Sequence, residues 1–206
     1  MADPRTVSVP LVAGVILAGG RALRMGGGDK GLALLAGRPI LAHVVERLAP
    51  QVGRLALNAN GDPQRFAAFG LPVIPDGLPG HAGPLAGILA GLEWAAAIGA
   101  DAIVTAAADT PFFPPDLVRR LRAAADAAGT DIAVAAGADG PHPTFGLWPT
   151  AGRAALQAAL AEGVRRVRDW AETNRAATAV FPDANAFFNV NTPADLVRAE
   201  AIAAGG

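Results

Sequence analysis

The sequence of 206 residues contains no cysteine and no tyrosine, and aromatic side chains make up only 5% of it. The absence of cysteine excludes disulfides, thiolate zinc sites and a cysteine nucleophile. Serine occurs once, as Ser8, and no Gly-x-Ser-x-Gly motif is present, which excludes serine hydrolase chemistry of that type. The three histidines are scattered along the chain and lack the spacing of a zinc site.

Charge is also scarce, at 17% of the residues, with 17 basic against 18 acidic side chains and a formal net charge of −1. This balance argues against a nucleic-acid partner and against a polybasic membrane surface. Because 52% of the residues are hydrophobic, the chain is not expected to be disordered. The basic residues include one lysine, Lys30, and all the others are arginines.

Long uninterrupted apolar runs are missing as well. No uncharged stretch reaches the roughly 18 residues of a membrane span without a glycine or proline. The apolar run that starts at Val7 follows one arginine and one aspartate, which is not the positive bias of an export signal. We therefore expect a cytoplasmic protein with no membrane partner.

Strand-length apolar runs alternate with helical patterns along almost the whole chain, and the length favours a single domain over residues 1–206. This alternation predicts an α/β fold, a single doubly wound and mostly parallel sheet with helices on both faces, in the Rossmann-like manner. Thr192, Pro193 and Asp195 fit the start of a last helix. The expected strands are 12–18, 55–57, 73–74, 102–107, 132–136, 144–148 and 177–181, and the expected helices are 40–48, 84–98, 115–128, 152–161 and 164–171.

Ligands of such sheets bind at the carboxyl ends of the strands, and a glycine-rich segment, residues 19–30, follows the first strand. Its glycines let backbone N–H groups turn toward an anion. Arg24 can hold phosphate oxygens in a fork, and Lys30 supplies a compact positive charge. The segment is neither a Walker A loop nor a dinucleotide fingerprint. Its glycines alone would also fit a flexible surface loop.

Asp109 follows the expected strand 102–107 and precedes Thr110 and Pro111. A carboxylate at that place, facing a phosphate-binding segment, suits Mg²⁺, which takes one or two carboxylates together with substrate phosphates. The tripeptide alone would fit a turn better, and the glycine-rich segment reverses that preference.

Asn58 and Asp76 follow the second and third strands. The amide of Asn58 could recognise a nucleobase, and the carboxylate of Asp76 could accept hydrogen bonds from N1–H and the 2-amino group of guanine. Taken singly, each residue fits a turn or a cap better. His81, in a Gly/Pro-rich segment, and His142, before Pro143, are secondary candidates for substrate contact.

The glycine-rich segment resembles the signature loop of nucleotidyltransferases, and the whole pattern resembles the molybdenum cofactor guanylyltransferases of that superfamily. The motifs that carry the resemblance are LAGG at 17–20, RMGG at 24–27, DK at 29–30, NAN at 58–60, Asp76, GPLAG at 83–87, DTP at 109–111, HPT at 142–144, GVRRV at 163–167 and FFNVNTP at 187–193.

The resemblance implies that the N-terminal half binds the nucleotide and the C-terminal half binds the pterin. The implied GTP contacts are Leu17, Ala18, Gly19, Gly20, Lys30, Asn58, Asp76 and Asp109. Arg24, Lys30 and Asp109 would be catalytic, with Asp109 as the ligand of Mg²⁺, the implied cofactor. Arg166, Asn189 and Asn191 would bind the pterin substrate.

The implied reaction transfers GMP from GTP to the terminal phosphate of molybdopterin or molybdenum cofactor and releases pyrophosphate. Molybdoenzyme apoproteins or cofactor-delivery proteins would be further partners. Three alternatives remain at this point: a cytidylyltransferase acting on the same pterin, a sugar-phosphate nucleotidyltransferase, and a non-catalytic adaptor that delivers the cofactor.

Overall fold

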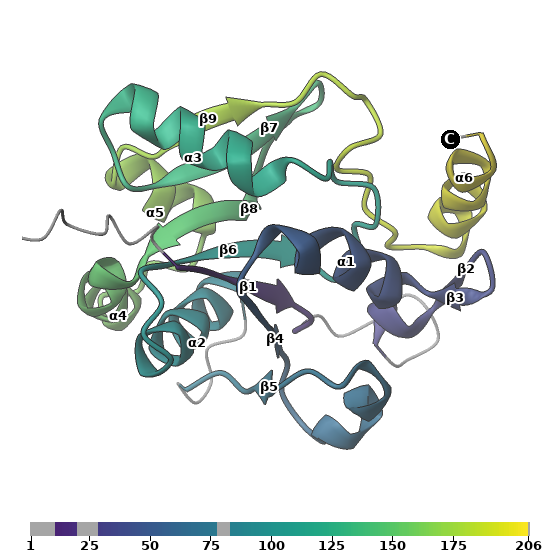
Figure 1. The fold of residues 1–206 in the computed structure, drawn as a ribbon, viewed down its shortest axis with the longest axis horizontal. Helices are drawn as coiled ribbons and strands as arrows, with labels where there is room; N and C mark the ends of the chain where they lie inside the picture. Colours follow the sequence, from purple (N-terminus) through teal and green to yellow (C-terminus); the bar gives the residue numbers. More distant parts are fainter. Residues whose placement is uncertain (1–10, 20–28, 78–82, 206) are drawn as a thin grey trace, which may run out of the picture.

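The computed structural model describes residues 11–19, 29–77 and 83–205. Their centre is a seven-stranded sheet in the order β5-β4-β1-β6-β8-β7-β9, shown in Figure 1. The pairs β5–β4, β4–β1, β1–β6 and β7–β9 are parallel, so the predicted mostly parallel α/β sheet is confirmed. The strands are β1 (Val12–Leu17), β4 (Arg54–Asn58), β5 (Val73–Ile74), β6 (Ala102–Ala107), β7 (Ala133–Gly137), β8 (Gly140–Pro149) and β9 (Ala177–Val180), and a separate pair consists of β2 (Leu34–Leu35) and β3 (Arg38–Pro39).

Helices cover both faces of the sheet, as predicted (Figure 1). Helices α1 and α3 pack on one face, and α2, α4 and α5 pack on the other. The helices are α1 (Ile40–Leu48), α2 (Pro84–Ala97), α3 (Leu117–Ala128), α4 (Arg153–Ala161), α5 (Val167–Thr173) and α6 (Pro193–Ala204). The 3₁₀ segments among the described residues are η1 (Lys30–Leu32), η2 (Ala49–Gln51), η3 (Pro63–Phe69) and η4 (Thr150–Gly152).

The apolar core lies on both faces of β1, because alternate residues of this strand enter two separate apolar clusters. Ile16 packs with α1 and α3, whereas Val15 packs with α2. Both side chains are fully buried, which is why this strand has a continuous apolar sequence.

Two local predictions need correction. Strand β8 is longer than the expected 144–148 and runs antiparallel to both β6 and β7. Helix α5 begins at Val167 rather than at 164, because Gly163 has a φ of 98° and Arg166 is extended. The N–H of Val164 donates to the carbonyl of Ala159, so these residues close α4 instead of opening α5.

The C-terminal helix begins as predicted. The side chain of Thr192 accepts a hydrogen bond from the N–H of Asp195, and the side chain of Asp195 accepts one from the N–H of Thr192. This reciprocal capping box fixes the segment just before α6. Across the described residues, no helix is both long and apolar enough to cross a membrane.

Candidate functional site

The carboxyl ends of three parallel strands are joined by backbone hydrogen bonds. The N–H of Ala18 donates to the carbonyl of Asn58 at 2.8 Å, and the N–H of Ala108 donates to the carbonyl of Leu17 at 3.1 Å. Leu17, Ala18 and Gly19 therefore continue β1 between the ends of β4 and β6. This arrangement places the predicted residues after β1, β4 and β6 at one edge of the sheet, where α/β proteins bind ligands.

Lys30, Asp109 and Asn191 meet at that edge. The ammonium group of Lys30 lies 3.7 Å from Oδ2 of Asp109 and donates a hydrogen bond to Oδ1 of Asn191. The N–H of Val190 donates to the carbonyl of Asp109 at 2.8 Å, which holds the segment 189–191 beside the end of β6. A residue expected at the pterin thus touches the residue expected at the phosphates.

Burial raises the pKa of the Asp109 carboxyl above its ordinary value, although the positive charge of Lys30 acts against this. The side chain is 19% exposed, so an ionised carboxylate here is poorly hydrated. A divalent cation would relieve that cost, and proteins usually hold Mg²⁺ with one or two carboxylates together with substrate phosphates. No group of three or more His, Cys, Asp or Glu among the described residues could hold a metal on its own. The donor set therefore fits Mg²⁺ shared with substrate phosphates.

Asn58 and Asp76 form a second cluster. The buried amide of Asn58 donates from Nδ2 to Oδ1 of Asp76 at 2.9 Å and to the carbonyl of Ile74 at 3.1 Å. Asn60 donates from Nδ2 to Oδ2 of Asp76 at 2.7 Å and accepts from the N–H of Asp76 at 2.9 Å. Each carboxylate oxygen keeps a further lone pair, so Asp76 is a preorganised acceptor with two adjacent oxygens.

Gly87 in α2 makes room for Asn58. A Cβ at this position would lie 2.1 Å from Oδ1 of Asn58 and 3.0 Å from Cδ2 of Leu17. Only glycine therefore permits α2 to pack this closely on the ends of β1 and β4. Gly87 belongs to the motif at 83–87, and the sequence alone gives no sign of this close approach.

The other predicted residues lie on separate segments, and some of them fall outside the described residues. Asn189 is exposed in the segment that passes Asp109. Arg166 is exposed at the start of α5, where the neighbouring carbonyl of Arg165 lies 4.0 Å from a Cβ built on Gly83. Arg166 therefore lies near the start of α2, on the face of the sheet opposite to α1. Gly20, Arg24 and His81 lie outside the described residues.

His142 lies at the start of β8, at the same edge of the sheet as the end of β7. Its Nε2 lies 2.8 Å from Oδ1 of Asp139, and its ring stacks on Phe187 with the centroids 4.6 Å apart. The ring therefore packs against the motif at 187–193 that also contains Asn189 and Asn191.

Sequence reasoning missed Arg65. It lies in η3, a segment without clear periodicity, and its Nε donates to Oδ2 of Asp29 at 2.5 Å. A lone arginine in an irregular segment carries no signal that would assign it to a site.

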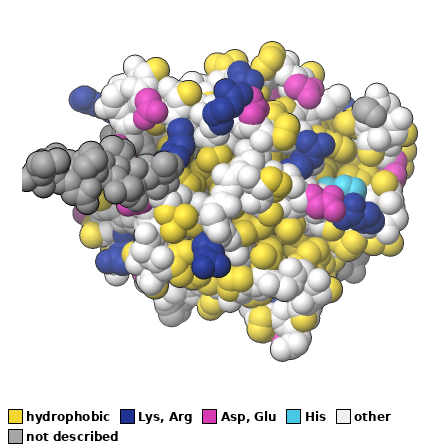
Figure 2. Space-filling view, viewed as in Figure 1, with side chains coloured by type: hydrophobic (Ala, Val, Ile, Leu, Met, Phe, Trp, Pro, Cys, Tyr) yellow, Lys and Arg dark blue, Asp and Glu magenta, His cyan; other side chains and the backbone are white. Residues whose placement is uncertain are grey.

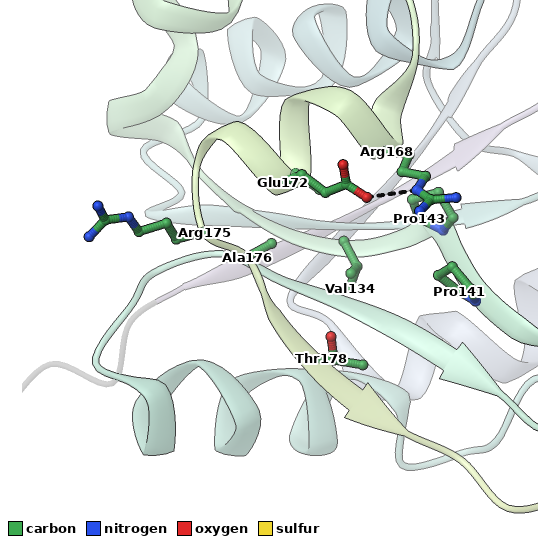
Figure 3. A pocket seen from close by; sticks show the side chains of 9 residues that line it. Val134, Pro141, Pro143, Arg168, Glu172, Arg175, Ala176 and Thr178 are labelled. Carbon is green, nitrogen blue, oxygen red and sulfur yellow. Dashed lines mark hydrogen bonds and ion pairs between the residues drawn. The ribbon is translucent and has the colours of Figure 1, made fainter.

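A cavity of about 360 Å³ lies elsewhere, between α5 and the strands β7, β8 and β9 (Figure 3). Arg168 and Glu172 pair at its rim, with 2.7 Å between Nε and Oε1. None of the predicted site residues that the structure describes lines it; its lining is Val134, Pro141, Pro143, Arg168, Ala171, Glu172, Arg175, Ala176 and Thr178. On the face of the molecule shown in Figure 2, basic and acidic side chains are interspersed, in keeping with the near-neutral net charge of the chain.

Sequence comparisons find relatives over almost the whole chain. Residues 14–178 match the sequence model of the MobA-like NTP transferase domain. A molybdenum cofactor guanylyltransferase from Bradyrhizobium sp. (strain ORS 278) is 52% identical over 99% of this chain and 97% of its own length. Another, from Cereibacter sphaeroides, is 55% identical over 92% of this chain and 95% of its own length.

Solved structures show the same fold. Molybdopterin-guanine dinucleotide biosynthesis protein A from Archaeoglobus fulgidus superposes with a TM-score of 0.74 at 26% identity, covering 95% of this chain and all of its own. A 4-diphosphocytidyl-2C-methyl-D-erythritol synthase from Anaerococcus prevotii gives 0.71 at 13% identity, covering 95% and 96% of the two chains, which is a likeness of fold alone.

Proposed function

Since the chain belongs to the molybdenum cofactor guanylyltransferases, we propose that it transfers GMP from GTP to the terminal phosphate of molybdopterin or molybdenum cofactor. The products are pyrophosphate and the guanine dinucleotide form of the cofactor. The observation that carries the proposal is the meeting of Lys30, Asp109 and Asn191 at the strand ends, beside the Asn58–Asp76 cluster.

The chemistry is a phosphoryl-type displacement. A terminal phosphate oxygen of the pterin attacks the α-phosphorus of GTP in line, the new P–O bond forms, and the bond to the pyrophosphate oxygen breaks. The protein forms no covalent intermediate, because positioning and charge neutralisation supply the acceleration. The ammonium group of Lys30, beside Asp109, would balance phosphate charge, and Arg24, in the same glycine-rich segment, would add a guanidinium.

Asp109 would hold Mg²⁺, which when bound neutralises charge on the α-phosphate and on the departing pyrophosphate. Burial raises the pKa of its carboxyl even though the ammonium group of Lys30 is close, so a divalent cation would stabilise the ionised form further. Leu17, Ala18, Gly19 and Gly20 would present backbone groups to the nucleotide.

Asp76 would select guanine. Its two oxygens, already oriented by the amides of Asn58 and Asn60, would accept hydrogen bonds from N1–H and the 2-amino group. Cytosine and adenine do not offer this pair of adjacent donors.

Asn191, Asn189 and Arg166 would hold the pterin, and an apoenzyme or a delivery protein would receive the product.

The proposal is tested by measuring pyrophosphate release with purified molybdopterin and each nucleoside triphosphate. We expect turnover with GTP and Mg²⁺, and little with CTP or without a divalent cation. The variant Asp76→Asn, which replaces one acceptor oxygen by a donor, should lose selectivity for GTP, whereas Asp131→Asn, at the opposite edge of the sheet, should keep it. Turnover with CTP but not GTP would overturn the guanine assignment. Unchanged cofactor maturation in Asp109→Ala would favour the delivery adaptor instead.

A further inference from the structure

Arg65 joins two segments that are far apart in the sequence. Its Nε donates to Oδ2 of Asp29 at 2.5 Å, the residue just before Lys30. Its two terminal nitrogens donate to the carbonyls of Asp62 at 2.6 Å and Asn60 at 2.5 Å. One guanidinium thus uses three donors on three acceptors from both segments.

The first segment carries the phosphate-binding ammonium group. The carbonyl of Asp29 accepts from the N–H of Leu32 at 3.0 Å, and this contact closes η1, which contains Lys30. Fixing the carboxylate of Asp29 therefore fixes the turn from which the side chain of Lys30 reaches Asp109.

The second segment carries the base-selecting carboxylate. Asn60 holds both the side chain and the backbone N–H of Asp76, through its Nδ2 and Oδ1 atoms. The carbonyl of Asn60 is in turn held by Arg65. The connection from Lys30 to Asp76 is continuous and passes through this guanidinium.

Arginine is the side chain that this arrangement requires. Its planar fork presents several donors in fixed directions, whereas an ammonium group is a point charge on a flexible stem. The backbone bends around the fork at Gly61, which has a φ of 84° and where a Cβ would lie 3.2 Å from a terminal nitrogen of Arg65. The side chains of Arg65 and Asp29 are 27% and 20% exposed, so solvent screens the pair only in part. The guanidinium also lies 4.6 Å from the ring centroid of Phe66.

We propose that Arg65 is a positioning residue that couples the Lys30 segment to the Asp76 segment and so fixes the distance between the phosphate and base sites. The identity of the nucleotide rests on the proposed function, but the coupling does not. A nucleotide with the wrong base would then hold its α-phosphate away from the position needed for attack. The reaction rate, and not only the affinity, would therefore depend on the base.

The first test uses the protein without nucleotide. Hydrogen exchange is followed at the N–H of Leu32, which reports on η1, and at the N–H of Asp76, which donates to Asn60. In Arg65→Met we expect both N–H groups to exchange about tenfold faster, because Asp29 and Asn60 each lose one charge-assisted hydrogen bond from the guanidinium. Arg65→Lys, which keeps the charge, should restore the Leu32 protection in part and the Asp76 protection little. The matched control Arg168→Met removes an exposed arginine–carboxylate pair and should change neither.

The second test compares affinity for GTP and for inosine triphosphate, which lacks the 2-amino group. We expect Arg65→Met to bind GTP about tenfold more weakly and to discriminate less between the two nucleotides. A purely structural role would lower stability and leave the discrimination intact. Unchanged exchange at both amides, or faster exchange at one alone in both Arg65 variants, would overturn the coupling. Failure of the wild-type protein to prefer GTP would overturn the proposed function, and the exchange experiment would still decide the coupling.

Discussion

The ammonium group of Lys30 lies 3.7 Å from Oδ2 of Asp109 and donates to Oδ1 of Asn191. Three segments meet in this contact: the end of the glycine-rich segment, the turn that follows β6, and the residues before α6. The chain has a single lysine, and it occupies this position. A compact charge fits between a carboxylate and an amide at this distance, whereas a guanidinium is larger and flat.

We therefore expect Lys30→Arg to lose turnover although it keeps the charge. The broader head group would displace Asn191 or withdraw from Asp109, and pyrophosphate release should fall about tenfold or more, which corresponds to roughly 1.4 kcal/mol in the barrier. The matched control is Arg153→Lys, a charge-conserving exchange at the exposed start of α4. Wild-type turnover in Lys30→Arg would show that charge alone is needed.

Asp109→Asn should make the protein more stable at neutral pH while it strongly lowers turnover. Burial raises the pKa of this carboxyl in the folded state. The folded protein therefore binds the proton more tightly than the unfolded chain, and stability falls as the pH rises from the ordinary aspartate value of 3.8 through the raised folded value. Asparagine carries no charge and avoids this loss.

The measurement is urea unfolding of both proteins without divalent cations, from acidic to neutral pH. The gain in the free energy of unfolding of Asp109→Asn should be small below the ordinary pKa and grow as the pH rises. Turnover should drop by about a hundredfold or more, because the Mg²⁺ that Asp109 is proposed to hold would contribute several kcal/mol of charge stabilisation. A variant that is less stable than the wild type at neutral pH would mean that the Lys30 contact outweighs the cost of burial.

The sequence predicted the fold well because apolar runs and helical spacing are local signals. It did not predict the direction of β8, since the run at 144–148 looks the same in either orientation. The start of α5 was wrong because Val164 fits a helical pattern, while the positive φ of Gly163 and the closing bond to Ala159 override it. Tertiary pairing decided the direction of β8, and the local geometry at the end of α4 decided the start of α5.

Part of the candidate site could be predicted from the sequence, and part of it depends on the fold. Asn58 ends β4, and Asp76 and Asp109 come shortly after β5 and β6, so their common location is a consequence of parallel pairing. The contact of Asn191 with Lys30 depends on how the segment before α6 crosses to the N-terminal half, which no local pattern encodes. The same holds for Arg65, whose three acceptors come together only in the folded chain.

Thr105→Val should destabilise the centre of the sheet. The hydroxyl of Thr105 is fully buried and accepts a hydrogen bond from Nε1 of Trp148 at 3.0 Å. Valine has the same shape but leaves the indole N–H without this acceptor, which costs about 1–3 kcal/mol. Urea unfolding measures the loss, and Thr178→Val on the exposed side of β9 is the control, expected to change stability by less than about 0.5 kcal/mol. Equal stability of the two variants would contradict the role of the hydroxyl.

Gly87→Ala should weaken nucleotide binding through Asn58. The new Cβ would lie 2.1 Å from Oδ1 of Asn58, so the amide must move and release Oδ1 of Asp76, now 2.9 Å from Nδ2. Gly91→Ala is the matched control on the same helix, because its Cβ would lie 2.9 Å from Val15 and 3.0 Å from Ile103, in the core.

Both alanine variants should lose stability by about 1–3 kcal/mol from overpacking, offset in part by the roughly 1 kcal/mol that alanine gains over glycine in a helix. Only Gly87→Ala should also lose affinity for GTP, by about tenfold, because it alone displaces an amide that orients the carboxylate of Asp76. Titration of GTP into each variant, after unfolding curves have shown that both are folded, separates the two effects. Equal affinity in the two variants would mean that the amide of Asn58 does not position Asp76 for the base.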